Sequence, residues 1–163
     1  MADEMKLKAL KRAMEKYGEA LVIEIVKQLK DADKNATGAL AKSIDYELIE
    51  ALDTIAINIL ALDYLDVVDG GRRKGAKAPP TEAIIKWMKV RKIKGRDKRG
   101  RFIKQKSTAF LIARSIGKNG IKGVYSIKKS INKLKSLQQK LLTEAAVEDM
   151  TNMIQGVFFN GNL

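Results

Sequence analysis

The stretch IDYELIEALDTIAINILAL, residues 44–62, alternates apolar and polar side chains on both sides of a short break. Apolar residues stand two apart before the break and again after it, at Ile44, Tyr46 and Leu48 and then at Ile55, Ile57 and Ile59. A period of two is that of β-strands with one buried face. With Asp53 and Thr54 near the turn, the stretch predicts an antiparallel β-hairpin, although the Ala and Leu beside the turn are also compatible with a helix.

The sequence on either side of this hairpin has the period of helices. From Asp3 to about Lys34, apolar residues recur three and four positions apart, which is the spacing of one face of an α-helix. Asp3 and Glu4 suit the electropositive start of that helix. After Thr37 and Gly38, residues 39–43 are compatible with one more helical turn.

A second long helix is predicted from near Ser126, over a C-terminal extension at residues 126–158. About 30 helical residues would extend about 45 Å, which is more than a small core needs. Part of this helix is therefore expected to pack on another subunit. The candidates for that contact are Leu134, Leu141 and Ile154.

The middle of the chain is predicted to hold shorter helices. Residues 63–69 form one or two turns that the glycines at 70–71 stop. Two prolines then lead into a helix that Thr81 caps, in which Trp87 is expected to lie in the core.

A basic loop is predicted to follow at residues 93–106, with a short extended piece at 101–103. Ser107 or Thr108 then caps another helix, which closes at Gly117. Together these elements predict an α+β chain with a long N-terminal helix, a small antiparallel sheet, central helices around a basic loop, and a long C-terminal helix. At 163 residues, we expect residues 1–163 to form a single domain.

The chain contains no cysteine and no histidine. This excludes disulfides, Cys or His zinc ligands, a cysteine nucleophile and a histidine general base. No apolar run approaches the roughly 20 residues that cross a bilayer, and Met1 is followed by charged residues where a signal peptide has an apolar core. We therefore expect a protein made and kept in a cytosol, with no cofactor and no membrane partner.

The net charge of +13 is concentrated in one loop-helix-loop segment, residues 70–106. That segment holds 15 lysines and arginines against only Glu82 and Asp97, so the rest of the chain sums to zero. Such a density of positive charge favours a polyanion, either nucleic acid or an acidic protein face. The candidate binding residues are Arg72, Arg73, Lys74, Lys77, Arg91, Lys92, Lys94, Arg96, Lys98, Arg99, Arg101 and Lys104.

Two weaker motifs lie next to this segment. Residues 70–75 have the GxxxxG spacing of a phosphate loop, but Ala76 stands where the lysine belongs, so a nucleotide site is not expected. Asp63, Asp66 and Asp69 recur every three residues and could hold Mg²⁺ for phosphoryl chemistry. Without a matching carboxylate cluster, the favoured interpretation is an acidic face that pairs with the basic loop of a neighbouring subunit, with no metal and no catalytic residue.

The order of several short motifs resembles a family of phage proteins. The motifs are NATGALAKSI at 35–44, YLDVVDGG at 64–71, APPT at 78–81 with IIKW at 84–87, and KGRDKRGRFI at 94–103 with AFLIARSIG at 109–117. This arrangement, over residues 35–123, resembles the neck and tail-completion family of long-tailed phages and related virion proteins of short-tailed phages that infect gut Bacteroidetes. The helix predicted from Ser126 onward differs from this family, because it is longer than a compact member needs.

The resemblance implies an α+β subunit of the head–tail connector that surrounds the DNA channel. It implies a homo-oligomeric ring of about 6 or about 12 copies, which docks to portal, other neck and tail proteins and makes non-specific contact with packaged DNA. Such a protein would be found in the virion and, during assembly, in the host cytoplasm. The main alternative is a sequence-independent nucleic-acid-binding module that works as a monomer or dimer, and an enzyme acting on nucleic acid is a third.

Overall fold

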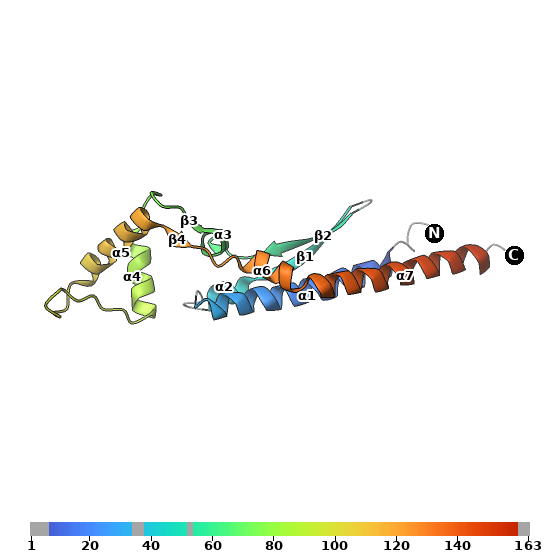
Figure 1. The fold of residues 1–163 in the computed structure, drawn as a ribbon, viewed down its shortest axis with the longest axis horizontal. Helices are drawn as coiled ribbons and strands as arrows, with labels where there is room; N and C mark the ends of the chain where they lie inside the picture. Colours follow the sequence, from blue (N-terminus) through green and yellow to red (C-terminus); the bar gives the residue numbers. More distant parts are fainter. Residues whose placement is uncertain (1–6, 34–37, 52–53, 160–163) are drawn as a thin grey trace. The chain divides into compact units, whose positions relative to one another are not determined.

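The computed structural model describes residues 7–33, 38–51 and 54–159 (Figure 1). The chain divides into two compact units. Unit 1 comprises residues 1–28, 43–61 and 126–163, and unit 2 comprises residues 29–42 and 62–125. The predicted α+β class is confirmed, with long helices near both ends and small antiparallel sheets. The expectation of a single domain over residues 1–163 stays a prediction.

Unit 1 contains the two long helices and the predicted hairpin. Helix α1 is Lys8–Asp31, whose last turn passes into unit 2, and α6 (Ser126–Lys133) and α7 (Lys135–Phe159) follow one another along the last part of the chain. Strands β1 (Asp45–Glu50) and β2 (Ile55–Leu60) pair antiparallel, with Asp45 opposite Leu60 and Glu50 opposite Ile55. The hairpin prediction is therefore confirmed, while Asp53 lies outside the described residues.

Small side chains form the apolar contact between α1 and α7. Ala9, Ala13 and Ala145 form a buried cluster, against which Leu10 and Leu141 pack. Along the same helix, Tyr17, Leu21 and Ile25 are buried at intervals of four. The predicted apolar face of the first helix is therefore its packing face.

Polar side chains fix the ends of these elements. The buried carboxylate of Asp149 on α7 accepts hydrogen bonds from the backbone N–H groups of Ala9 and Leu10, both at 2.9 Å. These are donors of the first turn of α1, which no intrahelical carbonyl can satisfy, and a negative charge there also opposes the helix dipole. Lys133 on α6 donates to Glu24 on α1 at 2.8 Å, which joins a second pair of helices.

Unit 2 contains the shorter helices. They are α2 (Ala39–Ser43), α3 (Leu65–Gly70), α4 (Thr81–Val90) and α5 (Gln105–Asn119). Helices α4 and α5 pack through Ile84, Met88, Ala109 and Ala113, with the half-buried Ile93 at the edge. The turns predicted at 39–43 and 63–69 are both helical, although the second begins at Leu65.

A second, very short sheet joins the two chain passages that lead to and from α4 and α5. Strands β3 (Gly71–Arg72) and β4 (Ile121–Lys122) pair antiparallel, which the sequence did not predict because two residues carry no readable period. A Cβ on Gly71 would lie 2.3 Å from the carbonyl oxygen of Ile121, and one on Gly123 would lie 2.2 Å from that of Asp69. Glycine is therefore required at both positions by the approach of the two backbones.

Three local predictions in unit 2 are wrong. Trp87 is exposed rather than buried, because α4 packs against α5 through Ile84 and Met88, and Trp87 does not belong to that cluster. Helix α4 has Pro80, not Thr81, at its N-cap, and the carbonyl of Pro80 accepts the first helical N–H groups. Helix α5 is Gln105–Asn119, so it begins before the predicted cap at Ser107 or Thr108 and ends two residues after Gly117.

Within the described ranges, none of the helices combines the length and the apolar character needed to traverse a lipid bilayer.

Candidate functional site

The predicted basic loop is an ordered β-hairpin, residues 94–104, here called the basic hairpin. Arg96 and Phe102 form an antiparallel bridge, and the N–H of Asp97 donates to the carbonyl of Arg101 at 2.9 Å. Nearer the helices, the N–H of Ile103 donates to the carbonyl of Gly95 at 3.1 Å. The segment predicted as a loop with one extended piece is therefore a turn closed by a single β-bridge.

Asp97 organises the tip of the basic hairpin. One carboxylate oxygen accepts the N–H groups of Arg99 and Arg101, both at 2.9 Å, and the other accepts the Nε–H of Arg101 at 3.0 Å. The backbone N–H of Arg101 is the main reason that the pKa of Asp97 lies below its ordinary value. The ionised form of Asp97 is therefore favoured, and it holds the side chain of Arg101 in an ion pair.

The signal for this turn was present in the sequence. An Asp at the first position and a Gly at the fourth are typical of a type I turn, and here they are Asp97 and Gly100. Gly100 has φ of 80°, a conformation that glycine adopts without strain, and its N–H donates to the carbonyl of Asp97 at 3.0 Å. The density of lysine and arginine around this pair concealed it.

Phe102 holds two cations on one side of the basic hairpin. The guanidinium carbon of Arg96 lies 4.3 Å from the centre of the Phe102 ring, and the ammonium nitrogen of Lys94 lies 5.7 Å from it. Both distances are within the range of a cation–π attraction. The ring itself is 63% exposed, so the cations and the aromatic face are presented to solvent together.

The base of the basic hairpin is held against α5. A Cβ on Gly95 would lie 2.1 Å from the hydroxyl oxygen of Thr108, so only glycine fits there. Thr108 is buried, and its hydroxyl donates to the carbonyl of Lys104 at 3.3 Å. The hairpin is thus attached to the α4–α5 core by backbone contact at one end and exposes its cations at the other.

Three of the predicted binding residues, Arg72, Arg91 and Arg101, form hydrogen bonds within unit 2. Arg91 donates to both carboxylate oxygens of Asp33 at 2.7 and 2.9 Å and to the carbonyl of Asp33 at 2.7 Å. Arg72 donates to the carbonyl of Lys77 at 2.6 Å, and Arg101 is held by Asp97. Sequence spacing could not reveal the Arg91 pair, because its partner is 58 residues away.

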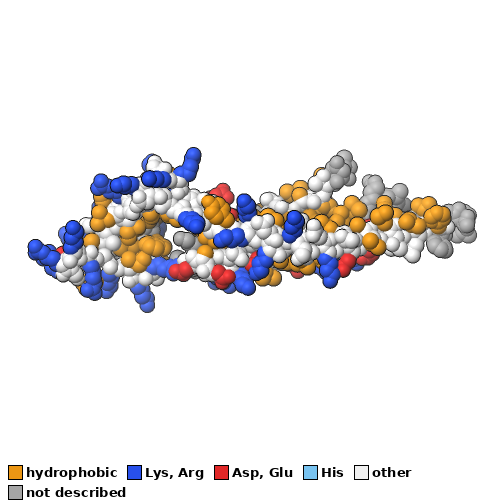
Figure 2. All heavy atoms as spheres, viewed as in Figure 1, with side chains coloured by type: hydrophobic (Ala, Val, Ile, Leu, Met, Phe, Trp, Pro, Cys, Tyr) orange, Lys and Arg blue, Asp and Glu red, His pale blue; other side chains and the backbone are white. Residues whose placement is uncertain are grey.

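The other predicted binding residues are exposed, and within residues 7–33, 38–51 and 54–159 none of them forms an ion pair with a carboxylate. Figure 2 shows lysine and arginine gathered over α4, α5 and the basic hairpin, with few acidic side chains among them. The residues of this set are Arg73, Lys74, Lys77, Lys92, Lys94, Arg96, Lys98, Arg99 and Lys104. Only the last five lie on the basic hairpin.

The acidic triplet is not a carboxylate cluster. Asp63 precedes α3, whereas Asp66 and Asp69 lie three residues apart within it. Among the residues that the structure describes, no group of three or more Asp or Glu is placed to hold a metal ion. Asp63 and Asp66 are exposed and Asp69 is half-buried.

The candidate inter-subunit residues of the last helix have different environments. Leu141 is partly buried against the alanine cluster of α1 and α7, so it contributes to packing within unit 1, and Leu134 is half-buried between α6 and α7. Ile154 is exposed, and so are Val157 at 72% and Phe158 at 69%. Among the described residues of α7, the two most exposed apolar side chains, Val157 and Phe158, therefore lie in its last turn.

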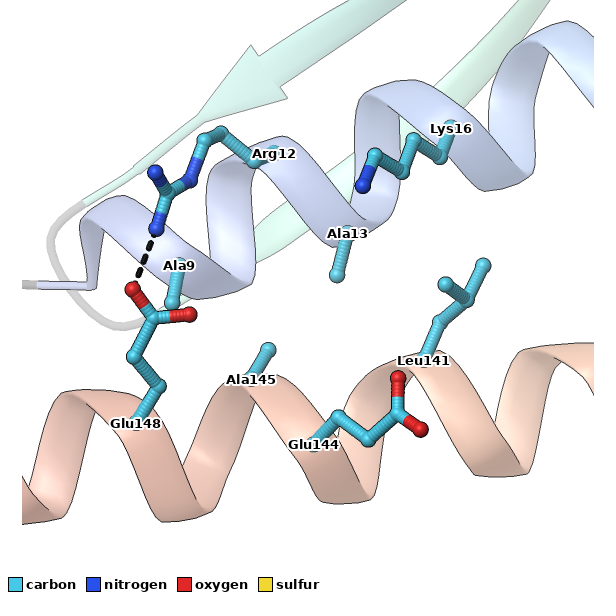
Figure 3. Close-up of a pocket in the computed structure, with 8 residues that line it drawn as sticks. All are labelled: Ala9, Arg12, Ala13, Lys16, Leu141, Glu144, Ala145 and Glu148. Carbon is cyan, nitrogen blue, oxygen red and sulfur yellow. Dashed lines mark hydrogen bonds and ion pairs between the residues drawn. The ribbon is translucent and has the colours of Figure 1, made fainter.

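The alanine packing leaves an open groove of about 300 Å³ between α1 and α7 (Figure 3). Ala9, Ala13 and Ala145 form its apolar floor, and charged side chains form its rim. Arg12 on one side pairs with Glu148 on the other, which closes part of the rim with an ion pair. The two cations and two carboxylates of the rim, Arg12, Lys16, Glu144 and Glu148, sum to zero charge, so the groove does not select an ionic ligand by net charge.

A larger open groove, of about 570 Å³, lies in unit 2 between α5 and the chain that precedes α4. Its lining includes the apolar Ala78, Pro79 and Phe110, and the cationic Arg114 and Lys118. Phe110, Arg114 and Lys118 are four residues apart along α5, so they form one stripe of that helix. That spacing was visible in the sequence, but nothing there indicated that the stripe would border a groove.

The basic hairpin and its neighbours can neutralise negative charge and donate hydrogen bonds to oxygen atoms, which are the interactions that bind phosphate backbones and carboxylate surfaces. No protein-family model, no curated protein and no solved structure matches this chain.

Proposed function

We propose that the chain is a structural virion protein of a tailed bacteriophage, a subunit of a ring in the head–tail connector through which DNA passes. The observation that carries this proposal is the basic hairpin, a fixed element that presents Lys98, Arg99 and Lys104 without acidic partners in the described chain. The motif order over residues 35–123 supports the same assignment, and most of those residues belong to unit 2.

The cations of the basic hairpin are suited to contact DNA that slides through a channel. Lysine and arginine contacts to phosphate are electrostatic and independent of sequence, so they allow a duplex to slide. The turn at the tip of the basic hairpin consists of Lys98 and Arg99. It is too short to place a helix or a two-stranded ribbon in the major groove, where base edges are recognised. Contact would therefore be weak, salt-sensitive and without base preference.

Assembly is the second part of the proposal. The last turns of α7 expose Ile154, Val157 and Phe158, which the described residues of unit 1 leave uncovered. Exposed apolar side chains that follow one another on a helix mark a surface for another protein. In this function, copies of the chain associate into a closed ring that docks to portal, other neck and tail proteins, in the host cytoplasm and then in the virion.

One alternative draws on the same charge. A sequence-independent nucleic-acid-binding module would use the basic hairpin as a monomer or dimer and would need no ring. The exposed Phe102 beside Arg96 favours it, since single-stranded nucleic acids stack on aromatic and guanidinium faces. Oligomeric state separates the two functions.

The test is native mass spectrometry and negative-stain electron microscopy of the purified full-length chain, alone and mixed with the portal protein of the same phage. We expect a closed ring of uniform stoichiometry, alone or on the portal. A chain that stays monomeric or dimeric under both conditions, while binding single-stranded DNA tightly, would replace the connector proposal with the alternative.

A further inference from the structure

The last turns of α7 and the groove beside α5 are two surfaces with matching chemistry that the described chain leaves open. We infer that, in the ring, the end of α7 of one copy docks into the α5 groove of a second copy. The inference rests on the proposed function for the ring and names the contact that builds it.

The inserted surface is apolar on more than one side. Met150, Ile154 and Val157 follow a spacing of four and three, which aligns them on one face of α7, and Phe158 lies next to them. These residues lie beyond Asp149, whose carboxylate accepts hydrogen bonds from the first turn of α1. This end of α7 can thus be covered without disturbing the packing inside unit 1.

The receiving groove has an apolar part and a cationic part. Ala78, Pro79 and Phe110 supply apolar surface, and Phe110 is 57% exposed. A volume of about 570 Å³ lies within the range of pockets that enclose ligands much larger than one side chain, about 300–1,000 Å³. The groove therefore has room for the side chains of Val157 and Phe158 together.

Charge selects the end of α7 over other apolar surfaces. A helix C-terminus carries partial negative charge on its unpaired carbonyls, which cations in the last turn normally offset. The last turn of α7 contains no basic residue. Arg114 and Lys118 stand at the groove, exposed and without carboxylate partners in the described residues, so they can supply that missing charge from a second copy.

The contact is head-to-tail, because it joins two different surfaces of the same chain. Each copy then offers one free α7 end and one free groove, so addition continues until a ring closes or a filament grows. Pairing of two α7 ends with each other would stop at a dimer. The two modes predict different products and can be separated by cross-linking.

The test uses the absence of cysteine from the chain. Full-length variants carry Val157→Cys, Ala78→Cys or both, and mild oxidation is followed by a denaturing gel without reductant. The double variant is expected to give a ladder of dimers, trimers and larger species. A mixture of the two single variants should stop at the dimer, and each single variant alone should cross-link no more than background.

A matched control combines Ala78→Cys with Ile23→Cys, because Ile23 is 69% exposed and Val157 is 72% exposed. Docked thiols have an effective concentration of about millimolar, so at micromolar protein the Val157 pair should cross-link at least about tenfold faster than the control. Equal rates would mean random collision and would overturn the inference.

Three further outcomes would overturn the inference. The Val157→Cys variant alone could form as many dimers as the mixture of the two single variants, or the double variant could form its cross-link within one chain. The double variant could also form no more cross-link than the Ile23→Cys control. The first identifies symmetric pairing of α7 ends and the second identifies the chain's own groove as the occupant. A second measurement compares Phe158→Asp with Ile23→Asp by native mass spectrometry. We expect only the former to reduce the ring to monomers.

These outcomes also separate the inference from the proposed function. A ring that persists in the Phe158→Asp variant leaves the connector function standing and shows the docking contact to be wrong. A ladder from a protein that forms only open filaments supports the contact and argues against the connector.

Discussion

Removing three cations from the basic hairpin should change how strongly salt weakens DNA binding. The variant is Lys98→Ala, Arg99→Ala and Lys104→Ala, whose side chains are exposed and lack carboxylate partners in the described chain. Each phosphate contact contributes about 0.9 to the slope of log affinity against log salt, so three contacts contribute about 2.7. Arg101 is left in place, because Asp97 already neutralises it and its removal would disturb the turn.

The assay is fluorescence anisotropy with labelled duplexes of unrelated sequence between about 50 and about 200 mM salt. Over this fourfold range, a slope difference of about 2.7 means that the wild type loses about 40-fold more affinity than the variant. Both proteins should bind all duplexes alike, since phosphate contacts carry no sequence information.

The matched control removes the same charge from unit 1, as Lys128→Ala, Lys129→Ala and Lys135→Ala, all exposed positions. Its slope should equal that of the wild type. If the hairpin variant keeps the wild-type slope, or if the control loses as much, the hairpin does not contact DNA. Its charge would then serve an acidic protein surface, for which Asp63 and Asp66 on a neighbouring copy are candidates.

Three further predictions concern unit 1. Asp149→Ala should lower the free energy of unfolding by about 2–4 kcal/mol, measured by urea denaturation, because one buried and one half-buried N–H group of α1 lose a charged acceptor. Gly18→Ala should lower the free energy of unfolding by at least about 1 kcal/mol despite the higher helix propensity of alanine, because the new Cβ would lie 2.5 Å from the Tyr46 ring. If that clash is the cause, the Gly18→Ala, Tyr46→Ala double variant should be no less stable than the Tyr46→Ala single variant. The hydrogen bond from Lys133 lowers the pKa of Glu24, so its stabilisation is complete above the ordinary pKa of a glutamate and is lost as pH falls through the lowered value. Thermal melts from neutral to acid pH should therefore show a smaller loss for Lys133→Ala than for the wild type.

The elements that the sequence predicted well are those with a long period or a clear turn. The face of α1 through Tyr17, Leu21 and Ile25 repeats every four residues, and the strands around residues 44–60 repeat every two, so burial and sequence coincide. The β3–β4 pair was missed because two residues hold no period, and pairing there depends on backbone approach at Gly71.

The sequence predicted where the cations of the candidate site lie along the chain, but not which of them form ion pairs. Counting cations identified residues 70–106, yet it treated Arg91 and Lys98 alike, whereas Arg91 is held by Asp33 and Lys98 has no such partner in the described chain. A pairing across 58 positions is fixed by the fold, which no local pattern encodes. Trp87 was misplaced for a related reason, since a helix face shows that it is apolar without showing whether a neighbour covers it.

The β3–β4 pair makes residues 73–120 a closed excursion of the chain. Its entry and exit are held side by side by two paired residues on each strand and by glycines that no side chain can replace without displacing backbone. A change of length or sequence inside the excursion, at the basic hairpin above all, leaves the spacing of its two ends unaltered. The basic hairpin is therefore a place where changes of length or sequence should disturb the β3–β4 pair least.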